Sequence, residues 1–295
     1  MKHALLGLIA ETSIHAGAGK AVGVIDLPIM REAHSDWPCI FGSAVKGALR
    51  AKAEQQDHQW ITDVFGPNTK NASDHAGAIA VGDARLLLMP IRSLSTHFKW
   101  VTCPALLQRA VSDAKRLGMS PDIGSALSIS KDDEAITPDH EGSLFLEEFH
   151  FTAKKLPNAQ NMEKLLNWLA SFVDVDGADF KAKLQKQLVI VSDNVFASIA
   201  RYSTPVTPHI AIDNTNKTVK NGALWYEETL SPETVLYVTL AAHPSRKDNT
   251  QFSAEQILAA VLSLFPAEKP YLQLGGNETV GMGWCRVNRV KKVGA

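Results

Sequence analysis

The chain has 295 residues, of which 45% are hydrophobic and 21% charged, as in an ordinary globular protein with a substantial core. Its formal net charge of −1 excludes a protein that holds duplex DNA across its whole surface, although a narrow basic stripe for nucleic acid is compatible with it. The three cysteines lie far apart without a Cys-x-x-Cys pair, which excludes a disulfide framework, argues against structural zinc and favours a reducing compartment.

Neither a membrane segment nor a secretion signal is expected. No apolar run reaches the length of a bilayer span. The apolar start of the chain is interrupted at Glu11, and no convincing cleavage site follows. We therefore expect a cytoplasmic protein with no membrane partner.

Hydrophobic periodicity and turn residues define the predicted elements of the amino-terminal half. Ser43 can cap a helix whose buried face carries Val45 and Leu49, and Pro104 opens a second helix. In chain order, this half predicts a strand over residues 2–14, a glycine-rich turn over 15–23, an irregular loop over 25–38, a helix over 43–56, a strand over 77–89 and a helix over 104–118.

The carboxyl-terminal half begins with a polar, acidic stretch over residues 119–142, which is either a surface excursion or partly disordered. Two alternating runs that flank the polar sequence DNTNK predict a long hairpin over 208–228. The other predicted elements are, in chain order, a strand over 143–151, helices over 161–173 and 193–201, a strand over 234–243, a helix over 253–265 and a pair of strands over 271–290 that glycines interrupt.

The order of the principal elements is strand, helix, strand at the front and strand, helix, strand at the back, with insertions between them. This order predicts an α+β fold of the ferredoxin-like, RNA-recognition-motif-like type. Because that fold serves many functions, the chemistry has to come from individual motifs.

Several common motifs are absent. The sequence GAGKA resembles a phosphate-binding loop, but it lacks the preceding glycine and has Ala21 where Ser or Thr would bind magnesium. The patterns G-x-G-x-x-G after a strand, H-E-x-x-H and G-x-S-x-G do not occur. The sequence therefore contains none of the motifs that are typical of nucleotide hydrolases, zinc proteases or serine hydrolases.

The sequence LGGNETVGMGW near the end of the chain carries four glycines within nine residues: Gly275, Gly276, Gly281 and Gly283. Glycine weakens a strand, so a cluster needs a reason. Successive backbone amides in such a turn form a concavity that binds anions, and a nucleic-acid backbone would fit there. A tight hairpin with a bulge would give the same pattern.

The sequence FGSAVKGALRAK places Lys46 and Arg50 on one face of the first helix. Ser43 and the free amides of the first turn offer an anion site beside them. Gly47 costs the helix about 1 kcal/mol relative to alanine, which makes sense if something packs closely there. The helix either binds phosphate or carries two solvated cations on its surface.

Asp26 lies between Ile25 and Leu27 in the first loop, an apolar setting that perturbs a carboxylate. His15 belongs to the adjoining glycine-rich turn. The two residues are suited to acid–base work, or Asp26 to a divalent cation. Otherwise Asp26 is a turn residue and His15 a hydrogen-bonding group at the end of a strand.

The sequence GALWYEETL ends the predicted hairpin. Trp225 and Tyr226 could stack on bases, and Glu227 or Glu228 could reach a reacting phosphate. Aromatic residues at the base of a hairpin are more often part of the core.

These segments occur together, in the order HAGAG…IDLPIMRE, IFGSAVKGALR, LWYEE and LGGNETVGMGW. In this order the chain resembles, over nearly its full length, the RAMP superfamily of CRISPR proteins. Within it, the chain resembles the backbone subunit of type III-B (Cmr) RNA-guided effector complexes, the subunit that cuts target RNA. The resemblance implies a single RAMP domain over residues 1–295, with a palm, a finger-type insertion over about 57–142 and a thumb hairpin over about 204–222.

The resemblance also implies the activity and the partners. The expected partners are a CRISPR guide RNA, a complementary single-stranded target RNA, other Cmr subunits and copies of the chain in a head-to-tail helical filament. The target 2′-OH would attack the adjacent phosphate at regular intervals. Asp26 is then the essential cleavage residue, as the ligand of a divalent cation, Mg²⁺ or Mn²⁺, or as the group that takes the 2′-OH proton. His15 and Glu227 would support it.

The guide backbone would be held by residues of the first helix and the glycine motif: Ser43, Lys46, Arg50, Gly275, Gly276, Gly281 and Gly283. Three alternatives remain open from the sequence. The chain could be a backbone subunit that does not cut, a guide-processing ribonuclease of the same superfamily that uses His15 as its base, or a ferredoxin-like metabolic enzyme or sensor that binds a small anion.

Overall fold

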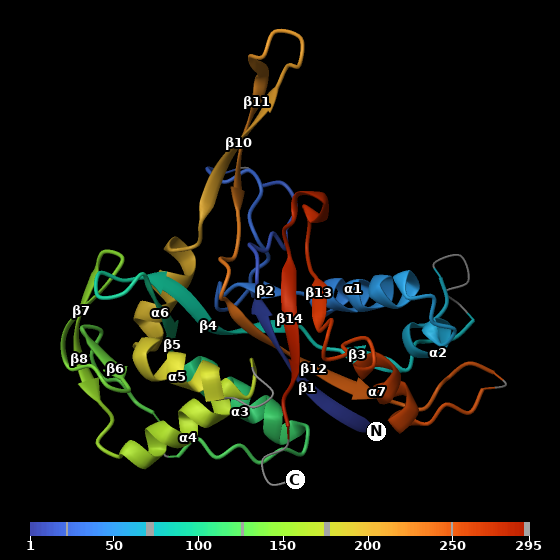
Figure 1. Cartoon of the computed structure of the whole chain (residues 1–295), viewed down its shortest axis with the longest axis horizontal. Helices are drawn as coiled ribbons and strands as arrows, with labels where there is room; N and C mark the ends of the chain where they lie inside the picture. Colours follow the sequence, from blue (N-terminus) through green and yellow to red (C-terminus); the bar gives the residue numbers. More distant parts are fainter. Residues whose placement is uncertain (22, 69–73, 125–126, 174–177, 249, 292–295) are drawn as a thin grey trace.

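One large sheet runs through most of the molecule (Figure 1). The computed structural model describes residues 1–21, 23–68, 74–124, 127–173, 178–248 and 250–291. Four antiparallel strands lie side by side at the centre of the sheet, in the order β14 (Trp284–Arg289), β1 (Lys2–Ala10), β12 (Val235–Ala242) and β4 (Ala84–Arg92). Three short strands flank them: β13 (Tyr271–Gln273) beside β14, β3 (Ile79–Val81) beside β12 and β2 (Cys39–Ile40) beside β4.

Beyond β4 the sheet continues as a wing of mostly short strands. They follow in the order β5 (Phe98–Thr102), β9 (Leu188–Ile190), β6 (Glu134–Thr137), β8 (Phe149–Lys155) and β7 (Gly142–Leu146). The pairs β5–β9 and β6–β8 are parallel and the other pairs are antiparallel. Strands that are distant in the sequence therefore meet in this wing.

Helices cover both faces of the central strands, and β1 shows the consequence. Its side chains alternate between two hydrophobic cores: Leu6 and Leu8 point into one, and Leu5 and Ile9 into the other. Because both faces are buried, β1 is apolar at almost every position instead of alternating with polar residues. The first core is covered by α1 (Gly42–Gln55), α2 (Ile61–Phe65), α6 (Asp193–Tyr202) and α7 (Ala254–Leu262), and the second by α3 (Pro104–Arg116), α4 (Ala159–Ala170) and α5 (Ala178–Gln187).

A two-stranded hairpin stands off the main sheet (Figure 1). It consists of β10 (Val206–Ile212) and β11 (Val219–Glu228). Strand alternation places apolar, exposed side chains on one face of it: Val206, Ile210, Ile212, Val219, Leu224 and Tyr226. On the other face, the rings of Trp225 and His209 stack on each other with centroids 5.5 Å apart. The predicted hairpin over residues 208–228 is confirmed.

The helices predicted over residues 104–118 and 253–265 are confirmed, and Ser253 forms a capping box with Gln256 at the start of α7. Other predicted bounds differ. The first strand ends at Ala10, residues 77–89 form β3 and part of β4, and residues 143–151 belong to the two strands of the β7–β8 hairpin. No helix among the described residues is long and apolar enough to cross a membrane.

Candidate functional site

Segments that are far apart in the sequence converge at the base of the β10–β11 hairpin. Ile14 forms an antiparallel bridge with Leu230, and Leu27 forms a parallel bridge with Glu227. The Gly276 amide donates a 2.8 Å hydrogen bond to the carbonyl oxygen of His15. The first glycine-rich turn, the Asp26 loop, the LWYEE sequence and the terminal glycine motif therefore form one continuous site.

Asp26 lies against the end of β11 and is half-buried. Its Oδ2 accepts a 2.8 Å hydrogen bond from the backbone amide of Tyr226, and the next residue, Leu27, donates its amide to the Tyr226 carbonyl at 3.0 Å. Among the described residues, Oδ1 has no hydrogen-bond partner. The carboxylate is thus held in place through one oxygen, while the other is available to an incoming group.

His15 is buried between the two glycine-containing segments, with a side chain 11% exposed. Its Nδ1 lies 2.8 Å from the carbonyl oxygen of Glu228 and 3.9 Å from the nearer carboxylate oxygen of Glu227. A carbonyl oxygen only accepts, so Nδ1 carries the hydrogen. This contact fixes the ring orientation and ties the first turn to the end of β11.

Glu227 and Glu228 are both buried but face different partners. Glu227 accepts a 2.6 Å hydrogen bond from the side-chain amide of Asn277, in the terminal glycine motif. Glu228 accepts from Arg31 at 2.5 Å, from the Thr204 hydroxyl at 2.6 Å and from the Ile29 amide at 3.0 Å. Of the two carboxylates, Glu227 therefore belongs to the His15 side of the site, whereas Glu228 holds the Asp26 loop to the hairpin base.

Arg31 completes this buried network and was not singled out by its sequence context. Besides Glu228, its guanidinium donates to the carbonyl oxygens of Asp36 and Ala200, at 2.8 Å each. Arg31 thus connects the Asp26 loop with α6 and β11. A single arginine in an irregular loop is usually a solvated cation, and only the long-range pairing with Glu228 shows otherwise.

We expect Glu228→Gln to destabilise the fold by about 3–5 kcal/mol, because it leaves the charge of Arg31 buried without a counter-charge. Urea unfolding of the purified chain measures the loss. Glu54→Gln is the matched control: it removes the charge from the exposed Arg50–Glu54 pair on α1 and should cost less than about 1 kcal/mol. Equal losses in the two variants would contradict a structural role for the buried pair.

The glycines of the terminal motif fall into two groups. A Cβ on Gly275 would lie 2.4 Å from the His15 carbonyl oxygen, and one on Gly283 would lie 2.2 Å from the Leu274 carbonyl oxygen. These two positions lack a side chain because the protein's own backbone fills the space. At Gly281 a Cβ would meet nothing within 4 Å, and at Gly276 its nearest neighbour would be 3.7 Å away. Only Gly276 and Gly281 leave open room for another molecule.

The three candidate RNA-binding residues of α1, Ser43, Lys46 and Arg50, differ in whether they are free to bind a ligand. Ser43 does not cap the helix: the N-cap is Phe41 without a side-chain hydrogen bond, and the Gly42 amide donates to Asp83 at 2.7 Å. Arg50 is engaged internally, with hydrogen bonds to Glu54 and to the carbonyl oxygens of two residues after α2.

Among the described residues, Lys46 differs from Arg50 in having no counter-charge, as does Lys52, whose ammonium lies over the ring of Phe265. Lys46 forms no ion pair in the part of the chain that the structure describes. Burial, and after it the nearby charges of Arg50 and Arg246, lower the pKa of its ammonium group. Arg50 and Arg246 thus both repel Lys46, and an anion bound beside Lys46 would relieve that repulsion. Arg246 is a further member of this basic cluster that the sequence did not indicate.

The residues around Asp26 do not fit a resident metal ion. Among the described residues, no group of three or more His, Cys, Asp or Glu side chains could hold one. Asp26 supplies one carboxylate, and the nearby Glu227 is turned toward Asn277. The donor set for a protein-built divalent site is therefore incomplete.

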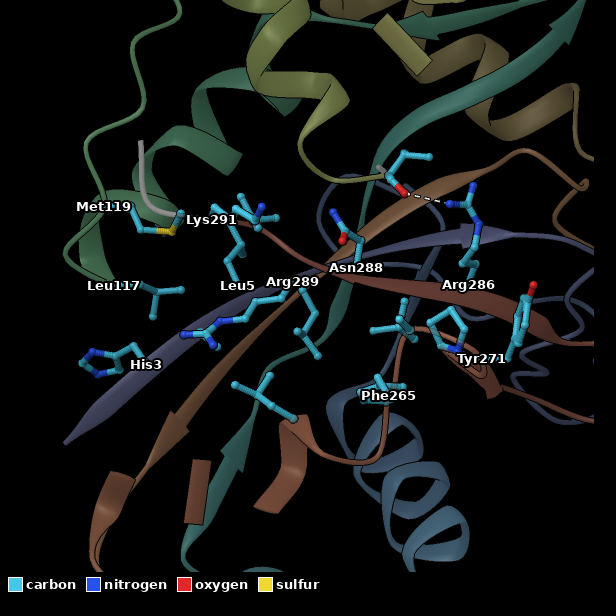
Figure 2. Close-up of a pocket in the computed structure, with 18 of the residues that line it drawn as sticks. His3, Leu5, Leu117, Met119, Phe265, Tyr271, Arg286, Asn288, Arg289 and Lys291 are labelled. Atoms are coloured by element: carbon cyan, nitrogen blue, oxygen red, sulfur yellow. Dashed lines mark hydrogen bonds between the residues drawn. The ribbon is translucent and has the colours of Figure 1, made fainter. Parts of the chain in front are cut away.

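A cavity of about 830 Å³ lies beside β1 and β14, with a lining that extends from His3 to Arg286 (Figure 2). Apolar and basic side chains line it, among them Leu5, Leu117, Phe265, Arg286, Arg289 and Lys291. No sequence-predicted site residue lines the cavity, which is separate from the hairpin-base site.

Comparisons with known proteins agree with the geometry. The RAMP superfamily matches residues 8–286. The chain is 34% identical over 293 residues to the CRISPR system Cmr endoribonuclease Cmr4 of Pyrococcus furiosus, covering 97% of this chain and 95% of the relative. It is 26% identical to the CRISPR system CMR subunit Cmr4 of Saccharolobus solfataricus, over 93% of this chain and 92% of the relative.

Two solved structures extend the comparison. The crystal structure of oligomeric Cmr4 from Pyrococcus furiosus is similar with a TM-score of 0.75 and 28% identity, over 98% of both chains. The cryo-EM structure of the type III-B Cmr-beta bound to cognate target RNA contains a chain with a TM-score of 0.73 and 22% identity, again over 98% of both. The second likeness concerns the fold alone.

Proposed function

Because the chain belongs to the RAMP superfamily and, within it, to the Cmr4 family, we propose that it is the guide-RNA-binding backbone subunit of a type III-B effector complex and cuts complementary target RNA at regular intervals. The observation that carries the proposal is the position of Asp26, whose carboxylate is anchored at the base of a projecting hairpin. A relative of 34% identity is named an endoribonuclease.

The central strands support a ferredoxin-like palm. In chain order, the four strands of this palm are β1, β4, β12 and β14. In the sheet they lie antiparallel in the order β14, β1, β12, β4, so the fourth strand of the palm lies beside the first, and the third lies between the first and the second. The β10–β11 hairpin then corresponds to the thumb proposed over residues 204–222. Within the finger-type insertion proposed over 57–142, β3 and β4 belong to the palm sheet, α3 packs on its face, and β5 and β6 belong to the wing beyond β4.

Cleavage would follow from positioning and one proton transfer. The thumb displaces one nucleotide at each repeat, so that the target 2′-oxygen comes into line with the adjacent phosphorus. Asp26 accepts the 2′-OH proton as the 2′-oxygen bonds to phosphorus and the bond to the 5′-oxygen breaks. Water protonates the leaving 5′-oxygen. The products are a 2′,3′-cyclic phosphate and a 5′-hydroxyl.

The neighbours of Asp26 leave it available for this role. Its Oδ2 is oriented by the Tyr226 amide, and its Oδ1, which has no partner in the part of the chain that the structure describes, can accept a proton. His15 and Glu227 support the site by holding the glycine motif against β11. None of these steps uses a metal, because the donor set does not fit a resident ion. An Mg²⁺ or Mn²⁺ ion needed for cleavage would take most of its ligands from RNA oxygens.

A target RNA with a 2′-deoxy nucleotide at a single cleavage position tests this chemistry. We expect cutting to be lost there and retained at the neighbouring positions, because only the modified nucleotide lacks the attacking oxygen. Denaturing gels of the assembled complex with end-labelled target give the pattern. Cutting at the 2′-deoxy position would instead show that water is the nucleophile.

Self-association is part of the proposed function. Sizing the purified chain with single-stranded RNA of increasing length should give a length-dependent ladder of complexes, because each copy covers a few nucleotides. A small oligomer whose size does not change when RNA is added would support a metabolic enzyme or sensor instead.

A further inference from the structure

The second ring nitrogen of His15 has no partner among the described residues. Nδ1–H donates to the Glu228 carbonyl, so in the neutral imidazole Nε2 is an acceptor. Nε2 is not among the polar atoms that are both fully buried and unpaired, so part of its surface is exposed to solvent although the residue as a whole is buried. The tautomer is fixed by the protein, and the acceptor is left for a ligand.

Two glycines border this nitrogen. A Cβ on Gly17 would lie 2.7 Å from Nε2, and one on Gly276 would lie 3.7 Å from the adjacent Cδ2 of the ring. A side chain on Gly17 would therefore cover the acceptor. The missing side chains keep the Nε2 edge of His15 accessible along the terminal glycine motif.

The chemistry of the acceptor restricts its ligand. Phosphate oxygens only accept hydrogen bonds, so they do not satisfy Nε2 of a neutral histidine. Bases carry donors, but a subunit that binds any guide sequence cannot depend on them. The donor that every ribonucleotide offers on its backbone is the 2′-hydroxyl, which DNA lacks.

We propose that Nε2 of His15 accepts a hydrogen bond from a ribose 2′-hydroxyl of the guide strand, and that this contact selects RNA over DNA. The proposal rests on the proposed function, since it takes the glycine motif as the path of the guide. It makes His15 a specificity-determining residue that contacts the guide, separate from the attack on the target strand at Asp26.

The test is a double-mutant cycle between His15 and the guide sugar. Purified full-length chain is titrated onto single-stranded RNA and onto the same sequence with 2′-fluoro sugars, which keep the RNA sugar pucker but lack the donor. His15→Asn removes Nε2, while the asparagine amide can still donate to the Glu228 carbonyl. His34→Asn, at a histidine side chain that is 82% exposed, is the matched control.

We expect the wild type and His34→Asn to bind the 2′-fluoro strand about 2- to 10-fold more weakly per bound copy, the size of one lost hydrogen bond. His15→Asn should bind the two strands equally. Discrimination by His15→Asn at the wild-type level, or equal binding of both strands by the wild type, would overturn the proposal. Absence of binding to either strand by the wild type would instead contradict the proposed function itself.

If His15→Asn does not fold, the wild type alone remains informative through ¹⁵N NMR of its labelled histidines. The proposal requires a neutral His15 with hydrogen on Nδ1 and a shift of its Nε2 signal when ribose RNA, but not the 2′-fluoro strand, is added. The same Nε2 shift with both strands would count against it.

Discussion

Asp26→Ala should leave the effector complex assembled on its guide and lower target cutting by about 10²- to 10⁴-fold, the range for loss of a positioned general base. The residue lies on a loop that Arg31 and Glu228 hold independently of its carboxylate. Removal of the Asp26 carboxylate therefore eliminates the proton acceptor but leaves the loop in its position. Single-turnover assays with bound target measure the rate.

Asp26→Asn separates chemistry from anchoring. The asparagine oxygen can still accept the hydrogen bond from the Tyr226 amide, but an amide cannot take a proton. We expect it to be as inactive as Asp26→Ala. Asp36→Asn is the matched control in the same loop. Asp36 has φ +58°, a conformation that asparagine also tolerates, so the complex with this variant should cut at the wild-type rate. Cutting by Asp26→Asn at that rate would remove Asp26 from the chemistry.

Shortening the hairpin is the second change with a large expected effect. In this variant an Asn-Gly turn replaces residues 211–223 and joins Ile210 to Leu224, which face each other across β10 and β11. The contacts at the hairpin base remain, so the fold and guide binding should persist. Cutting should fall at least about 100-fold at every position, because the target is no longer distorted into line.

The control for hairpin length is Asn214→Ala, which changes the polar tip but keeps both strands. It should cut normally. The proposed thumb would be contradicted if the shortened chain cut at the usual positions and rates. Loss of guide binding in the shortened chain would show instead that the apolar hairpin face is needed for assembly before cleavage begins.

Local patterns predicted the local elements well. The hairpin over 208–228 follows from alternation around a polar turn, and α7 corresponds to the helix predicted over 253–265. The strand pairing in the wing of the sheet could not be predicted from local patterns. There β6 pairs in parallel with β8 and also pairs with β9, which lies more than fifty residues later in the chain. Residues 119–142 are polar and weakly patterned, so nothing local indicated that they contribute a strand.

The candidate site was predictable where motifs carry it and not where long-range packing does. The sequence indicated Asp26, His15 and Glu227, and the structure brings their segments together. It did not indicate Arg31, whose role appears only with Glu228 across the fold. It left the terminal glycines open between an anion-binding turn and a tight hairpin with a bulge, and did not indicate that Gly275 and Gly283 make room for the protein's own backbone.

A density map of the Asp26→Asn complex with guide and uncut target would test the central claim most directly. The account predicts that the substituted side chain at position 26 lies within hydrogen-bond distance of a target 2′-hydroxyl at each repeat, beside a displaced nucleotide and the base of the β10–β11 hairpin. A target strand that passes this loop without contact, with the displaced nucleotide elsewhere, would contradict it.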